Sequence, residues 1–223
     1  MPAVLVIIIM YRWRAGAATA IYASLRMLVQ LLLIGYVLVY IFETDQWAVI
    51  SAVLLVMLLA ASWIAVRTVE QPSPRVYANS FVAVAVSGVP ILWLVTQYVI
   101  DIEPWFKPRF VVPLGGMIFS GSMTAISIAA ERLASELAAG KPLADAQRKA
   151  FSAAMIPVVN SLFAVGLVAL PGTMTGQILS GVSPLIAAKY QIVVMAMLFG
   201  AAGIAAAVYL RLDERNAAAD GRR

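Results

Sequence analysis

The feature that most constrains this chain is a series of apolar stretches, each long enough to cross a lipid bilayer. A spanning α-helix needs about 20 mostly apolar residues, because the hydrocarbon core of a bilayer is about 30 Å thick. Hydrophobic residues make up 63% of the 223-residue sequence and charged residues 12%, against about 45–50% and 25% in soluble domains. Six stretches qualify, and they are Ile21–Phe42, Trp47–Val66, Val76–Ile100, Phe110–Ala130, Phe151–Leu170 and Lys189–Leu210. The sequence therefore predicts an all-α, polytopic transmembrane helical protein with six full spans.

A seventh apolar segment, Met1–Tyr11, is too short to cross a bilayer. Its basic residues Arg12 and Arg14 follow the apolar run, whereas those of a signal peptide precede it. No clean cleavage site with small residues is visible either. We therefore expect a partial span at the N-terminus, in addition to the six full ones.

The distribution of basic residues predicts an orientation. Cytoplasmic loops of membrane proteins are enriched in Lys and Arg. The segments 12–14, 67–75, 131–150 and 211–223, which follow alternate spans, hold most of the basic residues. These residues are Arg12, Arg14, Arg67, Arg75, Arg132, Lys141, Arg148, Lys149, Arg211, Arg215, Arg222 and Arg223. We therefore expect a cytoplasmic C-terminus, and the net charge of +5 indicates membrane orientation instead of nucleic-acid binding.

Several kinds of chemistry are missing from the sequence. The chain has no cysteine and no histidine, which excludes a Cys/His zinc site, a cysteine nucleophile and a histidine base. No acidic residue lies well inside a predicted span, so a carboxylate proton relay through the membrane is unsupported. The phosphate-loop pattern GxxxxGK[ST] is absent too. We therefore expect no enzyme and no ATPase site in this chain.

One polar stretch, Glu131 to Ala150, interrupts the apolar sequence. A helical pattern continues from the preceding span until Gly140-Lys141-Pro142, where Gly permits a helix end and Pro begins a new helix. We expect residues 143–150 to form a short helix near the membrane surface. The stretch is either a docking surface for a soluble partner or an ordinary cytoplasmic hairpin. Residues 1–210 then form one transmembrane domain, and residues 211–223 a disordered tail.

A second segment, from Met155 to Gly176, combines two prolines with three glycines in an apolar helix. Pro157 removes a backbone donor, and Asn160 and Ser161 place polar side chains just inside the span. Such breaks are tolerated in a membrane where they line a cavity or are buried in protein. The segment predicts either part of a substrate path or a kinked span that packs against a neighbour.

Two further groups are candidates for the same path. Met117, Met123 and Met174 offer soft sulfur ligands, although methionine is more often apolar packing material. Gly and Ser residues around Met117 also favour close helix contacts. Arg26 and Gln30 share one face of a predicted helix. Arg26 either faces a watery interior or extends to the interface.

Four stretches together resemble a known family. They are Gly35–Phe42, Val112–Ile118, Ala154–Gly172 and Ala187–Ile192. They are similar to the bacterial iron-export ABC transporter permeases, a family that includes the plant aluminium-sensitivity membrane subunits. The resemblance implies a bacterial inner-membrane permease without a nucleotide-binding domain of its own. Its partners would be a separate ATPase subunit, which binds the ATP, and a second permease copy. No cofactor in this chain is implied.

The resemblance also assigns roles to residues. Residues 131–150 resemble the coupling segment that docks an ABC ATPase, with Gly140 in the place of the loop glycine. The coupling candidates are Glu136, Gly140, Lys141, Asp145, Arg148 and Lys149. The path candidates are Asn160, Ser161, Met117, Met123, Met174, Arg26 and Gln30. The chain departs from the family pattern at Asn160 and Phe163, where the family carries Asp and Lys.

The sequence thus predicts the membrane subunit of an ABC exporter for iron or another metal ion. An ATP-independent transporter or channel is one alternative, and it requires a cluster of titratable or ion-coordinating groups in the membrane. A non-transporting membrane scaffold is another, and it requires that the polar groups in the spans be dispensable and that no ATPase partner exist.

Overall fold

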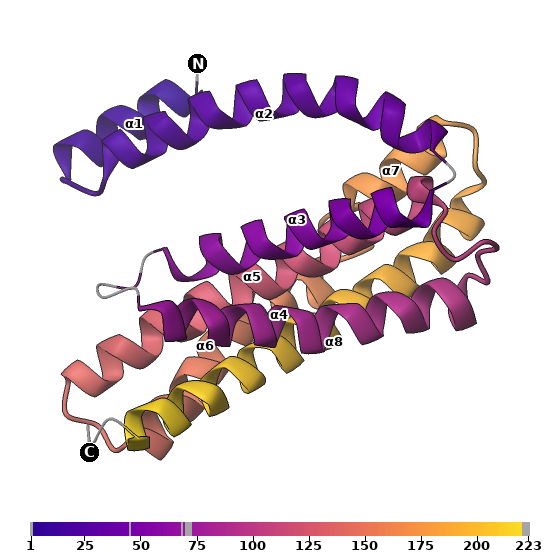
Figure 1. The fold of residues 1–223 in the computed structure, drawn as a ribbon. Coiled ribbons are helices and arrows are strands. Elements are labelled where there is room, and N and C mark those ends of the chain that lie inside the picture. Colours follow the sequence, from indigo (N-terminus) through magenta and orange to yellow (C-terminus); the bar gives the residue numbers. More distant parts are fainter. Residues whose placement is uncertain (1, 45, 68, 70–72, 220–223) are drawn as a thin grey trace. The chain divides into compact units, whose positions relative to one another are not determined.

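The computed structural model describes residues 2–44, 46–67, 69 and 73–219, with the backbone alone at 215–219. The described chain is helical, as expected, apart from turns and one isolated bridge between Val165 and Ala169 (Figure 1). The elements are α1 (Pro2–Arg12), α2 (Ala17–Glu43), α3 (Trp47–Val66), α4 (Pro74–Leu94), the π-helix η1 (Val95–Val99), α5 (Pro108–Ala138), α6 (Leu143–Ala164), α7 (Gly172–Leu179) and α8 (Pro184–Ala219).

Five helical segments in the described residues are long and apolar enough to cross a membrane. They are α2, α3, α4 with η1, α5, and α8 as far as Glu214. The expected count of six is not confirmed, because Phe151–Leu170 is not one helix. Helix α6 ends at Ala164, Val165 turns to an extended conformation, and Gly166 adopts a left-handed φ of 81°. Helix α1 has 11 residues, too few to span.

The chain divides into two compact units, residues 1–45 and 46–223. In the first unit, α1 and α2 pack against each other through a turn at Gly16, whose φ is 75°. The second unit comprises α3 to α8. The two cavities beside α7 and the ion pairs of Glu136 and Asp145 belong to this second unit.

Helix α5 lies at the centre of the second unit and packs against α3, α4, α6 and α8. Small residues set how closely the helices approach, as the Gly and Ser residues of 113–124 predict. A Cβ on Gly115 would lie 2.8 Å from the Leu54 side chain of α3. Buried serines also link the helices: Ser80 Oγ donates to the Ser62 carbonyl oxygen at 3.0 Å. Glycine and serine thus allow the helices to approach closely at these contacts.

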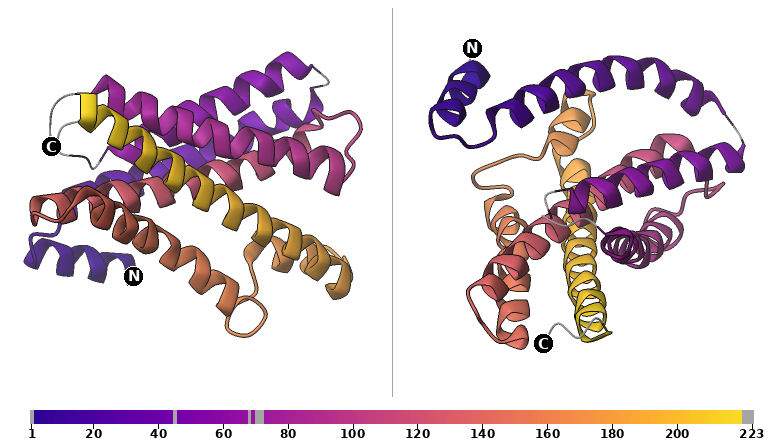
Figure 2. Two further views of the ribbon diagram at one scale, coloured as in Figure 1. Left: turned by 90° about the horizontal axis from the view of Figure 1, so that it is seen from below. Right: turned by 60° about the vertical axis from the view of Figure 1, so that its left-hand side comes forward.

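Helices α5 and α6 form a long hairpin at the end of the unit where α8 also ends (Figure 2). The 31 residues of α5 extend over about 46 Å at 1.5 Å per residue, more than the ~30 Å of a hydrocarbon core. The expected separate helix at 143–150 is wrong, because these residues are the first turns of α6. In the expected tail 211–223, α8 continues to Ala219, and 220–223 lie outside the described residues.

Candidate functional site

The hairpin turn has a well-defined helix cap. Gly140 has a left-handed φ of 73°. Its N–H donates to the Leu137 carbonyl oxygen at 2.9 Å, and the Lys141 N–H donates to the Glu136 carbonyl oxygen at 3.2 Å. These are the two hydrogen bonds of a Schellman motif. Pro142 then caps α6, so the expected helix break at Gly140-Lys141-Pro142 is confirmed.

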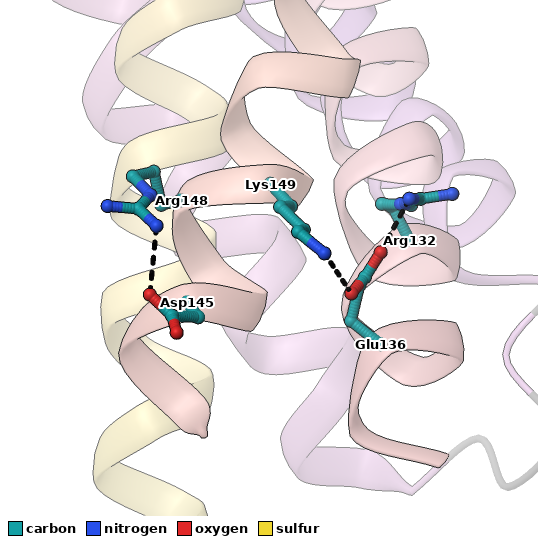
Figure 3. A network of polar contacts seen from close by, with 5 residues as sticks. All are labelled: Arg132, Glu136, Asp145, Arg148 and Lys149. Atoms are coloured by element: carbon teal, nitrogen blue, oxygen red, sulfur yellow. Dashed lines mark hydrogen bonds and ion pairs between the residues drawn. The ribbon is translucent and has the colours of Figure 1, made fainter. Parts of the chain in front are cut away.

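A charge cluster joins the two arms of the hairpin. The Glu136 carboxylate of α5, only 8% exposed, lies 2.9 Å from Lys149 Nζ of α6 and 2.5 Å from an Arg132 nitrogen (Figure 3). Asp145 and Arg148 form a second pair at 2.9 Å, but both belong to α6 and are exposed. Glu136 and Lys149 therefore bridge the arms, whereas Asp145 and Arg148 remain available at the surface.

Rows of alanine bring α5, α6 and α8 together near this end. Each row repeats every four residues, which places its members on one helix face. The buried cluster consists of Ala125, Ala129 and Leu133 on α5, Ala146, Ala150 and Ala154 on α6, and Ala202, Ala206 and Leu210 on α8. The Gln147 side-chain amide also donates to the Leu210 carbonyl oxygen at 3.1 Å. The small alanine side chains in these rows let the three helices approach closely.

A cavity of about 640 Å³ lies further along the same helices. Its walls come from α5, α6, the 165–171 turn, the first turn of α7, and α8. Ala125, Ala154 and Ala202 belong both to the alanine cluster and to the cavity wall. The cavity therefore begins where the close packing of the three helices ends.

The cavity wall contains one polar pair in which the glutamine is buried and the threonine is exposed. Thr173 Oγ1 of α7 donates to Gln191 Oε1 of α8 at 2.6 Å, and Gln191 is only 4% exposed. Gln191 also lines a second cavity of about 480 Å³ beside the first. Sequence reasoning did not single out Thr173 or Gln191 as site residues. The available signal was one glutamine inside a long apolar run.

The structure brings together only some of the predicted path residues. Met117 and Ser161 line the larger cavity, and Met174 lines the smaller one. Met123 and Asn160 line neither, and Asn160 is exposed. Arg26 and Gln30 belong to α2 in the first unit and line neither of these two cavities. Gln30 lines a separate pocket of about 370 Å³ on α2 itself.

A resident metal centre has no support in the described part of the chain. No group of three or more Asp, Glu, His or Cys residues there could hold a metal ion. Methionine sulfurs are the soft donors at the cavities, contributed by Met117, Met174 and Met195.

Comparison with known proteins places this architecture in a family. The chain matches the family described as "Uncharacterised protein family (UPF0014)" over residues 2–142 and 138–217. It is 34% identical to the UPF0014 membrane protein slr1647 of Synechocystis over 78% of this chain and 73% of that protein. It is 32% identical to the probable iron export permease protein FetB of Escherichia coli, over 85% and 78% of the two chains. It is 31% identical to the protein ALUMINUM SENSITIVE 3 of Arabidopsis thaliana, over 82% and 71%. No solved structure matches.

Proposed function

Because the chain belongs to the UPF0014 family of multi-pass membrane proteins, we propose that it is the permease subunit of an ABC exporter. A separate ATPase subunit would supply the energy, and iron or another metal ion would be the exported substrate. The name of the Escherichia coli relative supports iron export by a permease. The absence of a phosphate loop from this sequence fits an ATPase site on another chain.

The observation that carries the proposal is the continuity between hairpin and cavity. Helices α5 and α6 run without interruption from the Gly140 turn to the cavity wall. The ion pair between Glu136 and Lys149 links α5 to α6. A partner that moves the hairpin therefore moves the walls. Asp145 and Arg148, exposed on the first turns of α6, are available for contact with such a partner. Continuous packing from hairpin to cavity supports a coupling role for the hairpin.

The proposed transport cycle follows from this connection between the hairpin and the cavity walls. Two copies of the chain would work with two ATPase subunits in the bacterial inner membrane, with the hairpins and the C-termini in the cytoplasm. ATP binding would close the ATPase pair and displace both hairpins. The alanine-packed parts of α5, α6 and α8 would move as one body. The cavity would then change from being open to one side of the membrane to being open to the other. Met117, Ser161 and Met174 would line the path.

Co-purification tests the proposal. The full chain is expressed with the ABC ATPase encoded beside it, and ATPase activity is measured in lipid. We expect a complex whose activity depends on the permease. The surface variant Arg148→Glu, which reverses a charge, should weaken the complex, whereas Arg211→Glu should not. Arg211 is also an exposed arginine, but it lies on α8.

Two results would contradict the proposal. One is the failure of the two chains to form a complex when both fold. The other is a complex that tolerates Arg148→Glu and Gly140→Pro as well as it tolerates Arg211→Glu. Iron is tested separately: cells without the protein should retain more total iron under iron excess. Unchanged iron with altered content of another solute would reject iron as the substrate.

A further inference from the structure

The larger cavity has walls without formal charge. None of the described residues that line it, or the smaller cavity beside it, is Asp, Glu, Lys or Arg. An ion in such a place has no counter-charge, and the cost of removing it from water is several kcal/mol. The carboxylate oxygens that hard cations prefer are also missing from these walls. The cavity is therefore unsuited to a bare iron ion.

The same walls are well suited to a small organic molecule. A volume of about 640 Å³ lies within the range of about 300–1,000 Å³ for ligand pockets, which are mostly apolar with a few fixed polar groups. Alanine, valine, proline and methionine side chains dominate here. The fixed polar group is Gln191, which is more than nine-tenths buried.

Gln191 is oriented by its neighbour. Its Oε1 accepts the Thr173 hydroxyl at 2.6 Å, which directs the amide Nε2 elsewhere on a residue that lines both cavities. The amide therefore offers N–H donors on a residue that lines both cavities. A ligand with a hydrogen-bond acceptor would accept a hydrogen bond from this amide.

We infer that the cavity binds an uncharged, largely apolar molecule whose hydrogen-bond acceptor lies against the Gln191 amide. The inference rests on the proposed transport function and specifies the form of the substrate. A metal ion enters this cavity only inside an uncharged chelate, in which organic ligands present the apolar surface and the acceptor. An uncharged organic molecule and an uncharged metal chelate share this chemistry, because both present a neutral, largely apolar surface.

Binding to the purified full chain in nanodiscs tests the inference. The probes are 8-hydroxyquinoline, its uncharged tris-chelate with iron(III), and iron(II) sulfate. Ala169→Phe places a large side chain in the cavity wall. Leu167→Phe is the matched control, because Leu167 is 89% exposed and lines neither cavity. We expect an uncharged probe to bind, with the affinity lowered about tenfold or more by Ala169→Phe and unchanged by Leu167→Phe.

A second variant examines the polar contact. Gln191→Glu keeps the size of the side chain but adds a charge. It should therefore lower the affinity for the uncharged probes and allow iron(II) to bind. Monodisperse elution and an unchanged melting temperature show that each variant is folded. Binding of the metal-free probe indicates an organic substrate, and binding of the chelate alone indicates a complexed metal. Either result supports the inference.

Two results would overturn it. One is iron(II) binding to the unmodified chain that Ala169→Phe abolishes. The other is uncharged probes that bind both phenylalanine variants equally. If these occur while the ATPase complex forms normally, the inference fails and the exporter proposal stands. If uncharged probes bind as expected but no ATPase complex forms, the exporter proposal fails and the cavity assignment stands.

Discussion

Helices α5, α6 and α8 pack in two different ways along their length. At the hairpin end, alanines fill the contact and Glu136 joins the arms. Toward α7, the same helices enclose a cavity, and the 165–171 turn exposes apolar side chains such as Leu167. A dry contact between small residues resists sliding, whereas a cavity leaves its walls free to rearrange. We call the closely packed part the stiff end and the part with the cavity the loose end. In the proposed cycle, the stiff end would transmit motion and the loose end would bind the substrate.

The largest expected loss of stability comes from a substitution in the alanine cluster of the stiff end. Ala150 is fully buried in the alanine cluster. Ala150→Leu adds three heavy atoms where no space exists, and it should lower stability by about 1–3 kcal/mol. Ala144→Leu on the exposed face of α6 is the control and should have little effect. Thermal unfolding in nanodiscs measures both, and equal melting temperatures would show that the alanine contact is not tight.

The hairpin turn gives the next effect. Gly140 has a left-handed φ of 73° and nothing lies within 4 Å of a Cβ built there. Gly140→Ala should therefore cost about 1–2 kcal/mol through backbone conformation alone. Gly176→Ala, in open space within α7, provides the comparison and should not destabilise. A similar melting temperature for both variants would contradict the left-handed cap.

A smaller effect separates the bridging ion pair from the surface pair. Glu136→Gln removes the carboxylate that links α5 to α6. Lys149 and Arg132 remain half exposed and can be hydrated, so the chain should still fold. Amide hydrogen exchange in residues 139–146 should become faster with Glu136→Gln and stay unchanged with Asp145→Asn, since exposed pairs contribute little. If Asp145→Asn accelerates exchange equally, Glu136 is not the link.

The smallest effect concerns the loose end. Asn160 is exposed and lines neither cavity, so Asn160→Ala should leave probe binding unchanged within about twofold. Ser161→Phe, at the next residue and in the cavity wall, should lower it. A strong loss with Asn160→Ala would restore Asn160 to the path that the sequence predicted.

The sequence predicts features that depend on local backbone conformation, but not those that depend on contacts between distant segments. The hairpin turn was predictable, because Gly140 and Pro142 act through local backbone conformation. The link between Glu136 and Lys149 was not, because it depends on how α6 folds back on α5. The predicted span Phe151–Leu170 was not confirmed for a related reason: an apolar window counts residues to Leu170 and overlooks the turn at Gly166. Gln191 was overlooked because its importance comes from Thr173, on another helix.

The stiff and loose ends can be compared in one experiment. The chain has no native cysteine, so spin labels can be attached at chosen positions only. One pair, Ala144 with Arg211, reports on α6 and α8 at the hairpin end. The other, Phe110 with Leu167, reports on α5 and the turn beside the cavity. All four residues are exposed.

The measurement is the distance distribution of each pair in the permease–ATPase complex, with and without ATP. The account predicts that ATP shifts the Phe110–Leu167 distribution and leaves the Ala144–Arg211 distribution unchanged. A shift confined to Ala144–Arg211, or equal shifts in both pairs, would contradict the claim that the alanine-packed end moves as one body and transmits its motion to the cavity.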